Sequence, residues 1–338
     1  MDKNKAKSKK TKLIITITAA LVIITGAAVV CPFFFTTNGE SKTVYVYPNI
    51  SDSQNADSIR AQLNPSFADR LLSLTKLRSL RPGAYSIDAD ESAYSTWRKI
   101  SAGEQTPVRI RLNNMRTIDD FVTKASSQLA MNADELRNAI DKTIAEGDFS
   151  EETIPAMILP DTYEVYWTTS AEKLLAKLRK NYDNFWSADR KAKADKIGLT
   201  PVETSTLASI VEEETAYAPE KGTVARLYLN RLKQGMKLQS DPTVKFAVGD
   251  RTLRRILHKH LVTESPYNTY IVYGLPPGPI RMPSTATIDA VLNAPDNDYI
   301  FMCAKEDFSG SHNFTANYAE HMQNARRYQA ALNARGIN

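Results

Sequence analysis

The sequence predicts a mixed α+β protein: a single N-terminal transmembrane helix, then a small membrane-proximal α+β region, then a larger mixed α+β domain. Residues 13–35 carry no charge and are long enough to form one membrane-spanning helix. After them, short strands of alternating polarity are interspersed with amphipathic helices. The hydrophobic fraction of 42% and charged fraction of 24% are ordinary for a globular chain. A length of 338 residues suggests about two domains.

The positive charge of the chain is concentrated in its N-terminal tail, residues 1–12. Six lysines stand there against Asp2, which accounts for the whole formal net charge of +5. The remainder is close to neutral, so the basic balance gives no support to nucleic-acid binding. We therefore expect no nucleic-acid partner.

The uncharged run at residues 13–35 is predicted to be an uncleaved membrane anchor. As a helix it would span about 34 Å, enough for the apolar core of a bilayer. The lysines before it place residues 1–12 in the cytoplasm and the body of the protein outside, at the inner (cytoplasmic) membrane. A cleaved signal peptide is the alternative, but the run is long and ends in bulky residues. A lipoprotein site at Cys31 is disfavoured because Val30 precedes it.

Residues 36–149 are expected to form the membrane-proximal α+β region. Strands are predicted at residues 43–47, 84–87 and 108–112, and helices from about residue 52, around 67–77 and at 95–101. Two further helices follow: Thr117 caps one that runs through Leu129, and Asn132 caps the next. A strand followed by two short helices, at about 106–146, resembles a LysM module, a fold that binds glycans. A small packing domain is the alternative.

A second domain is expected at residues 150–338. It begins within a connector at 147–161 and contains a strongly amphipathic helix at 170–186. Residues 299–304 are predicted to form a buried strand that contains Cys303, which makes a disulfide with Cys31 implausible. A last helix is predicted at about 318–333.

A helix that ends in three consecutive glutamates is predicted after residue 200. Thr200 can cap it, and Pro201 and Glu203 suit its first turn. At 100° per residue, Glu214 falls inside the apolar arc, whereas Glu212 and Glu213 fall outside it. A partly desolvated carboxyl has a raised pKa and can act as a general acid. Alternatively, Glu214 simply turns to solvent at the helix end.

Several polar motifs follow this helix. Residues 236–244 are expected to form a tight polar loop after an apolar strand, which is typical of a ligand cleft. Residues 274–280 are too rich in Pro and Gly for regular structure and are expected to form a rigid surface wall. His258 and His260 have no third ligand nearby, so we expect no metal.

Six motifs in order resemble the MltG (YceG-like) endolytic murein transglycosylase family, over about residues 155–335. They are Ala-Ser-Ile-Val-Glu-Glu-Glu-Thr at 208–215, Asn-Arg-Leu at 230–232, Leu-Gln-Ser-Asp-Pro-Thr at 238–243, Tyr-Asn-Thr-Tyr at 267–270, Gly-Leu-Pro-Pro-Gly at 274–278 and His-Asn-Phe at 312–314. Two departures are modest: Ser240 stands where the family often has Thr, and residues 311–314 vary a Gly-His-Thr-Phe pattern.

The resemblance implies a lytic cut of nascent peptidoglycan strands between N-acetylmuramic acid and N-acetylglucosamine, which limits their elongation. It leaves a 1,6-anhydro-muramoyl end and needs one carboxyl group as acid and then base, without a cofactor. The family's motif carries two glutamates two apart, here Glu212 and Glu214. The helical phase selects Glu214, with Glu212 as the second candidate. The alternatives are a muramidase that hydrolyses the same bond, or a non-catalytic peptidoglycan-binding scaffold.

Other motif residues are expected to support this site, and Arg231 is expected to form a structural ion pair. His312 would either contact substrate or satisfy a buried carbonyl. Besides peptidoglycan and the membrane, cell-wall synthesis enzymes are an expected class of partner. The expected substrate-binding residues are Gln239, Ser240, Asp241, Thr243, Tyr267, Asn268, Tyr270 and His312.

Overall fold

The computed structural model describes residues 3–253 and 255–336, and it divides into two compact units. Unit 1 comprises Met1–Arg109 and Glu164–Thr169, and unit 2 comprises Ile110–Tyr163 and Ser170–Asn338. This division differs from the boundary expected at residue 150. Residues after 110 belong with unit 2 because they bond to later segments: the Met282 N–H donates to the Met115 carbonyl at 3.0 Å.

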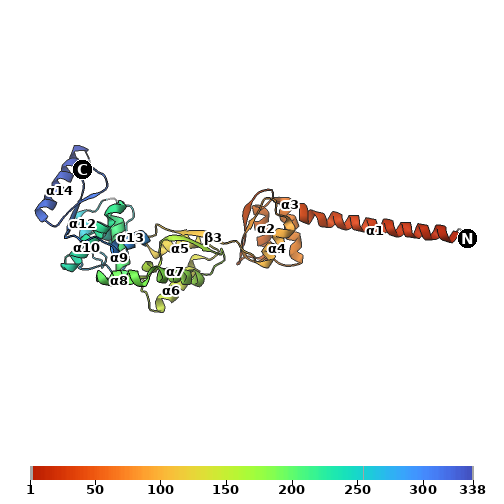
Figure 1. Ribbon diagram of the computed structural model, residues 1–338, viewed down its shortest axis with the longest axis horizontal. Helices are drawn as coiled ribbons and strands as arrows, with labels where there is room; N and C mark the ends of the chain where they lie inside the picture. The colour runs from red at the N-terminus through yellow and green to blue at the C-terminus, as the bar shows by residue number, and fades with distance from the viewer. Residues whose placement is uncertain (1–2, 254, 337–338) are drawn as a thin grey trace. The chain divides into compact units, whose positions relative to one another are not determined.

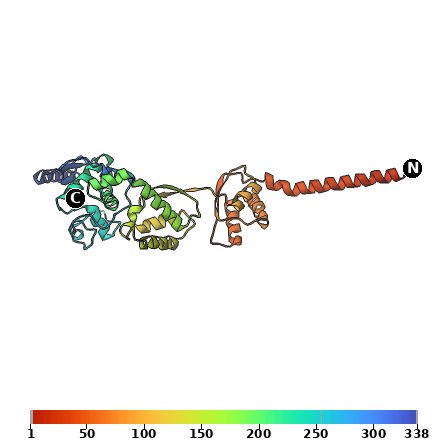
Figure 2. The ribbon, with the colours of Figure 1, turned by 60° about the horizontal axis from the view of Figure 1, so that its bottom comes forward.

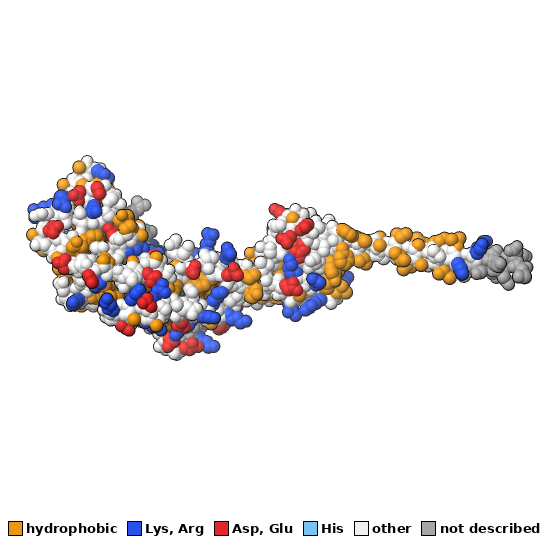
Figure 3. Space-filling view, viewed as in Figure 1, with side chains coloured by type: hydrophobic (Ala, Val, Ile, Leu, Met, Phe, Trp, Pro, Cys, Tyr) orange, Lys and Arg blue, Asp and Glu red, His pale blue; other side chains and the backbone are white. Residues whose placement is uncertain are grey.

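A single long helix, α1 (Lys3–Phe35), opens unit 1 (Figures 1 and 2). An 18-residue window within its stretch Lys9–Phe35 has a mean hydropathy of 2.6 and contains no buried residue, and Figure 3 shows the stretch covered with hydrophobic side chains. The hydroxyls of Thr16, Thr18 and Thr25 each donate to the carbonyl four residues earlier, so they need no external partner. The predicted N-terminal apolar helix is confirmed. Its length and composition suit a membrane span or a signal sequence.

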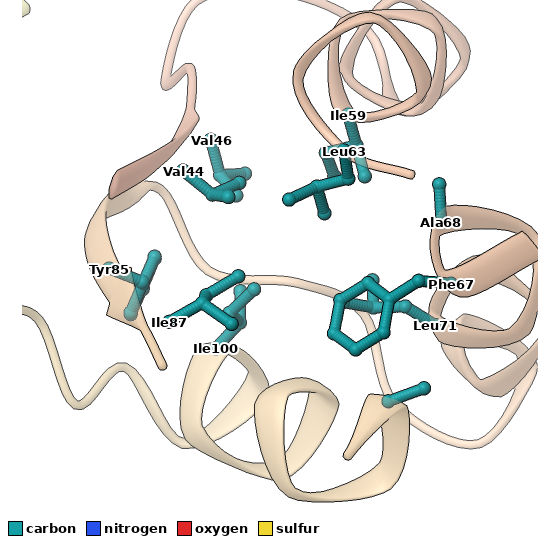
Figure 4. Close-up of a cluster of buried hydrophobic side chains, with 11 residues drawn as sticks. Val44, Val46, Ile59, Leu63, Phe67, Ala68, Leu71, Tyr85, Ile87 and Ile100 are labelled. Atoms are coloured by element: carbon teal, nitrogen blue, oxygen red, sulfur yellow. The ribbon is translucent and has the colours of Figure 1, made fainter. Parts of the chain in front are cut away.

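The rest of unit 1 packs an antiparallel pair of strands against three helices around one apolar core (Figure 4). Strands β1 and β2 are antiparallel, with Val44 opposite Tyr85. Alternate residues of β1 point inward, as the period-2 pattern predicts. The elements are β1 (Lys42–Val46), α2 (Asp52–Gln62), α3 (Pro65–Ser73), the 3₁₀ turn η1 (Leu74–Lys76), β2 (Gly83–Ile87) and α4 (Ala93–Ala102).

Two capped helices lie in sequence between the paired strands β3 and β4. Thr117 and Asn132 each close a capping box, as predicted. The first helix ends at Ser126, not at Leu129 as expected. The β-α-α-β order contains the predicted strand and helices, but the LysM likeness stays a prediction. The elements are β3 (Val108–Leu112), α5 (Ile118–Ser126), α6 (Ala133–Ala145), η2 (Ile154–Met157) and β4 (Asp161–Val165).

Most of unit 2 consists of short helices packed around α9 (Pro201–Glu214), which contacts α10, α11 and α13. Thr200 and Glu203 form its predicted capping box. The other elements are α7 (Ala171–Phe185), α8 (Ala188–Lys196), η3 (Ala218–Glu220), α10 (Lys221–Lys233), α11 (Asp241–Val248), α12 (His258–Leu261), α13 (Thr285–Leu292), β5 (Phe301–Ala304), β6 (His312–Thr315) and α14 (Tyr318–Ala334).

The expectation of a mixed α+β fold is confirmed, but three local predictions are wrong. The apolar arc expected on the glutamate helix is not distinct, since α9 is buried on all sides from Thr204 to Val211. The hydroxyls of Thr204, Thr206 and Ser209 bond to carbonyls of the same helix and need no water. No strand precedes the polar motif at 238–243; Asp241 instead begins α11. β5 is only half-buried, since it pairs with β6 at one edge and packs on α14.

Candidate functional site

The three glutamates at the end of α9 have three different environments. Glu213 is held between two arginines: Arg116 lies 3.0 Å from Oε2 and Arg281 lies 2.7 Å from Oε1. Both arginines are mostly buried, so these ion pairs are better shielded from solvent than ordinary surface pairs. Glu213 therefore has a structural role, as the shared partner of two arginines.

Glu212 is also held by neighbouring groups. The Ser284 N–H and hydroxyl donate to its Oε2 at 2.9 and 2.8 Å, and Arg281 lies 3.6 Å from its Oε1. Burial alone would raise its pKa, but bonds from Thr287 and Ser284, together with Arg281, hold the pKa below its usual value. A carboxyl that stays ionised is poorly suited to donate a proton.

Glu214 has the opposite electrostatics. Its Oε1 accepts hydrogen bonds from the Tyr228 hydroxyl, at 2.6 Å, and from the Ser240 hydroxyl. In the described part of the chain no group bonds to its Oε2. Burial raises the pKa of this carboxyl above its usual value, although the hydrogen bonds from the two hydroxyls act to lower it. Glu214 is thus the member of the run best suited to carry a proton near neutral pH.

An open cleft of about 300 Å³ adjoins Glu214. It brings together three of the predicted binding residues: Gln239, Asp241 and Tyr270. Tyr270 donates to Asp241 at 2.7 Å. Gln239 has a φ of 51°, in the region that favours glycine, which is a strained position for a side chain beside a candidate site. The lining residues are Glu214, Leu227, Tyr228, Arg231, Leu238, Gln239, Asp241, Tyr270, Met302 and His321.

Four other predicted binding residues support the cleft from outside it. Ser240 and Thr243 are fully buried, so Ser240 acts on Glu214 and Thr243 bonds to the Ser240 carbonyl. Asn268 is also fully buried and donates to the carbonyls of residues 261 and 263. Tyr267 packs on Phe246, with ring centroids 4.7 Å apart. Burial excludes Thr243 and Asn268 from direct contact with a sugar.

His312 bonds to a buried carboxylate, whereas a buried carbonyl was one of the two expected partners; its contact with substrate stays a prediction. Its Nδ1 lies 2.7 Å from the carboxylate of buried Glu220, and its own N–H donates to the same group at 3.0 Å. Thr215, the residue after Glu214, donates to Glu220 at 2.6 Å. His312 therefore ties β6 to the chain just after the glutamate run, because a buried carboxylate requires partners.

The cleft also contains residues to which the sequence analysis gave no role or the wrong one. Tyr228 and Arg231 lie three apart on α10, on one face of the helix. Arg231 does not form the expected ion pair among the described residues; it donates to the carbonyls of Ile300 and Leu238, both at 2.7 Å. His321 and Met302 also line the cleft. Only the helical spacing of Tyr228 and Arg231 could have signalled this from sequence.

No group of three or more His, Cys, Asp or Glu side chains that could hold a metal occurs in residues 3–253 and 255–336. His260, one of the histidines considered, accepts at Nδ1 from the Leu257 N–H at 3.0 Å and so helps to begin α12.

A family model described as "YceG-like family" matches residues 49–327. The chain belongs to the YceG-like family. The match spans both units and includes the cleft residues. It therefore covers the region that carries the sequence motifs.

Two curated relatives and one solved structure resemble this YceG-like chain. An endolytic murein transglycosylase of Bacillus subtilis is 34% identical over 165 residues, which are 49% of this chain and 45% of the relative. One of Streptococcus pneumoniae is 29% identical over 179 residues, 51% of this chain and 31% of the relative. The matched stretch thus spans less than half of each relative. A crystal structure of a YceG-like protein from Listeria monocytogenes has a TM-score of 0.57 at 23% identity, covering 84% of this chain and 98% of that one, which shows a shared fold.

Proposed function

We propose that this protein is a lytic transglycosylase that cuts nascent peptidoglycan strands internally, at the bond between N-acetylmuramic acid and N-acetylglucosamine. The observation that carries the proposal is Glu214, a carboxyl with a raised pKa beside an open cleft, whose Oε2 has no partner among the described residues. The B. subtilis and S. pneumoniae relatives are named endolytic murein transglycosylases, which supports the same reaction.

The reaction uses one carboxyl twice. Protonated Glu214 gives the Oε2 proton to the glycosidic oxygen as the bond from the muramoyl C1 breaks, and the electron pair leaves with that oxygen. The Glu214 carboxylate then removes the proton from the muramoyl C6 hydroxyl while O6 bonds to C1. The products are a 1,6-anhydro-muramoyl end and an N-acetylglucosamine end with a free 4-hydroxyl, and Glu214 is again protonated.

Tyr228 and Ser240 suit both halves of this cycle. Their hydroxyls occupy Oε1, so the proton of Glu214 is left to Oε2, to which no residue in the described ranges bonds. After proton transfer, the same two bonds stabilise the carboxylate, because a charged acceptor strengthens a hydrogen bond. Burial raises the pKa of Glu214 and these bonds lower it. This balance allows the group to act first as an acid and then as a base.

A hydrolase is the alternative reaction, and Asp241 is its candidate second carboxylate. Most glycoside hydrolases need a second carboxylate as nucleophile or base. Among the described residues that line the cleft, Asp241 is the one acid besides Glu214. Tyr270 already occupies Asp241 Oδ1 at 2.7 Å, which favours a role in binding over one in activating water.

We also propose that α1 anchors the enzyme in the cytoplasmic membrane by a single pass. The lysine tail would stay in the cytoplasm, and unit 2 and the part of unit 1 that follows α1 would lie outside, where peptidoglycan is made. Cell-wall synthesis enzymes are the partners to be expected beside such a site.

The test compares Glu214→Gln with Glu212→Gln and Asp241→Asn in the full-length protein on purified glycan strands. We expect Glu214→Gln to form product at least about 100-fold more slowly, which is the usual rate contribution of a general acid. Asp241→Asn should keep the anhydro product. Mass spectrometry identifies the product ends, and binding of strands by Glu214→Gln shows that the cleft remains intact.

Three results would contradict the proposal. Reducing ends that have gained water would indicate a muramidase. Full activity of Glu214→Gln with loss in Glu212→Gln would move the acid to Glu212. No release of product by the parent protein, with strand binding retained, would indicate a peptidoglycan-binding scaffold.

A further inference from the structure

Three aromatic rings from β5 and α14 form a continuous surface at one side of the cleft. The ring of Phe301 stacks on His321, with centroids 5.1 Å apart and planes 19° apart. The ring of Tyr318 lies 5.6 Å from Phe301 and 6.3 Å from His321. His321 and Met302, which adjoin these rings, both line the cleft beside Glu214. The aromatic surface is therefore continuous with the candidate active site.

Tyr318 at the edge of this surface is largely exposed. Its side chain is 62% accessible although its ring packs on another aromatic residue. As the first residue of α14, it is fixed in place by the cap that Asn317 forms with the Ala319 and Glu320 N–H groups. A rigidly placed, exposed aromatic face beside a cleft is a good contact for a ligand, since it binds with little loss of side-chain freedom.

His321 supplies the polar group of the same surface. Its Nδ1 is buried and has no partner among the described residues, which is an unusual state for a ring nitrogen. Burial, and then the charge of Arg231, lower its pKa below the usual value. The imidazole is therefore uncharged near neutral pH, and Nε2 is the nitrogen left to bond to an uncharged ligand in the cleft.

We infer that Tyr318, His321 and Phe301 form a sugar-binding subsite next to Glu214, which takes one pyranose ring of the glycan strand. The inference rests on the proposed function and adds to it a surface that binds the substrate. The apolar C–H face of the sugar would lie on the tyrosine ring, and a hydroxyl or acetamido group would bond to the imidazole. An aromatic face for stacking beside an uncharged imidazole suits an amino sugar and gives no preference to a charged ligand.

The test measures how the parent enzyme and its Tyr318 variants cleave purified glycan strands. Tyr318→Ala and Tyr318→Leu should each raise KM about tenfold, which corresponds to the upper range of an aromatic contact, and leave kcat within about twofold. Tyr318→Phe should restore KM because it keeps the ring. Tyr166→Ala is the matched control: Tyr166 is also exposed, at 52%, but lies in unit 1 and lines no part of the cleft.

A second measurement separates this inference from the proposed function. Binding of the same strands is measured with Glu214→Gln alone and with Glu214→Gln carrying Tyr318→Ala; we expect about tenfold weaker binding in the double variant. A KM for Tyr318→Ala and Tyr318→Leu equal to that of Tyr166→Ala would overturn the subsite and leave the catalytic proposal standing. Weaker binding in the double variant, with Glu214→Gln still fully active, would support the subsite and reject Glu214 as the acid.

Discussion

At the scale of single residues, the environment of Glu214 is set by two hydroxyls and by burial. Burial makes ionisation costly, and Tyr228 and Ser240 recover part of that cost by bonding to Oε1. Glu212 lies in the same last turn of the helix but has donors and positive charges around it, so its pKa moves the other way. Neighbouring groups, not residue type, therefore distinguish the two candidates.

Removing the Tyr228 hydroxyl should change the pH dependence of the reaction. A hydrogen bond to the charged form lowers the pKa of a carboxyl, so Tyr228→Phe should raise the pKa of Glu214 further. The acid must begin protonated, and kcat falls as pH rises through this pKa. We therefore expect the alkaline limb of the pH–kcat profile to move to higher pH.

Tyr163→Phe serves as the control for that measurement. Tyr163 also donates a buried hydroxyl bond, at 2.6 Å to the Leu159 carbonyl, but does not contact Glu214. Its profile should match that of the parent. A limb that moves to lower pH in Tyr228→Phe would show that Tyr228 does not stabilise the carboxylate.

At the scale of elements, the C-terminal end of α9 depends on ion pairs with distant segments. Three acids at a helix C-terminus are unfavourable because the end of the helix is itself negative. Arg281 contacts both Glu212 and Glu213, and Arg116 contacts Glu213 from the segment before α5. These pairs fix the last turn, and hence the direction of Glu214.

Substituting Arg281 should therefore destabilise the fold measurably. We expect Arg281→Met to lower the free energy of unfolding by about 1–3 kcal/mol, because it removes bonds to charged, mostly buried partners. Arg179→Met is the matched control, since Arg179 also pairs with two acids, Asp148 and Asp183, but at an exposed position. Its cost should stay below about 1 kcal/mol. Urea unfolding measures both, and equal losses would contradict a special role for Arg281.

At the scale of the whole molecule, the apolar helix and the cleft belong to different compact units. Unit 1 contains α1, whose end packs on the unit's own helices: Phe34 lies 4.8 Å from Tyr94, and Arg70 lies over Phe33. Unit 2 contains every residue that lines the cleft. The chemistry and the proposed anchoring are thus separable.

Deleting residues 1–31 should release the protein from the membrane without loss of catalysis. The deletion keeps Phe33 and Phe34, which pack on unit 1, and removes the apolar stretch. We expect the truncated protein in the soluble fraction, with the parent's activity on purified strands. The intact mass of the full-length protein, isolated from membranes, checks the anchor: a mass that lacks the N-terminal segment would indicate a cleaved signal sequence instead.

Local chemistry made much of the secondary structure predictable. The caps at Thr117, Asn132 and Thr200 bond to residues three positions away, so the sequence contains all the information they need. The same holds for the length and apolarity of α1 and for the alternation in β1. The strand expected before the motif at 238–243 is absent. The N–H groups of Gln239 and Ser240 donate to the carbonyl and the hydroxyl of Thr269, a residue far along the chain that local sequence does not reveal.

The sequence by itself determined the anchor candidate, the order of elements and the glutamate run as the centre of interest. Only the tertiary structure decided among the three acids. α9 is buried all round, so helical phase alone could not rank them, whereas Ser240, Arg281 and Arg116 come from segments 26 to 97 residues away. The pKa of a carboxyl depends on charges and donors within a few ångströms, and folding alone brings those groups together.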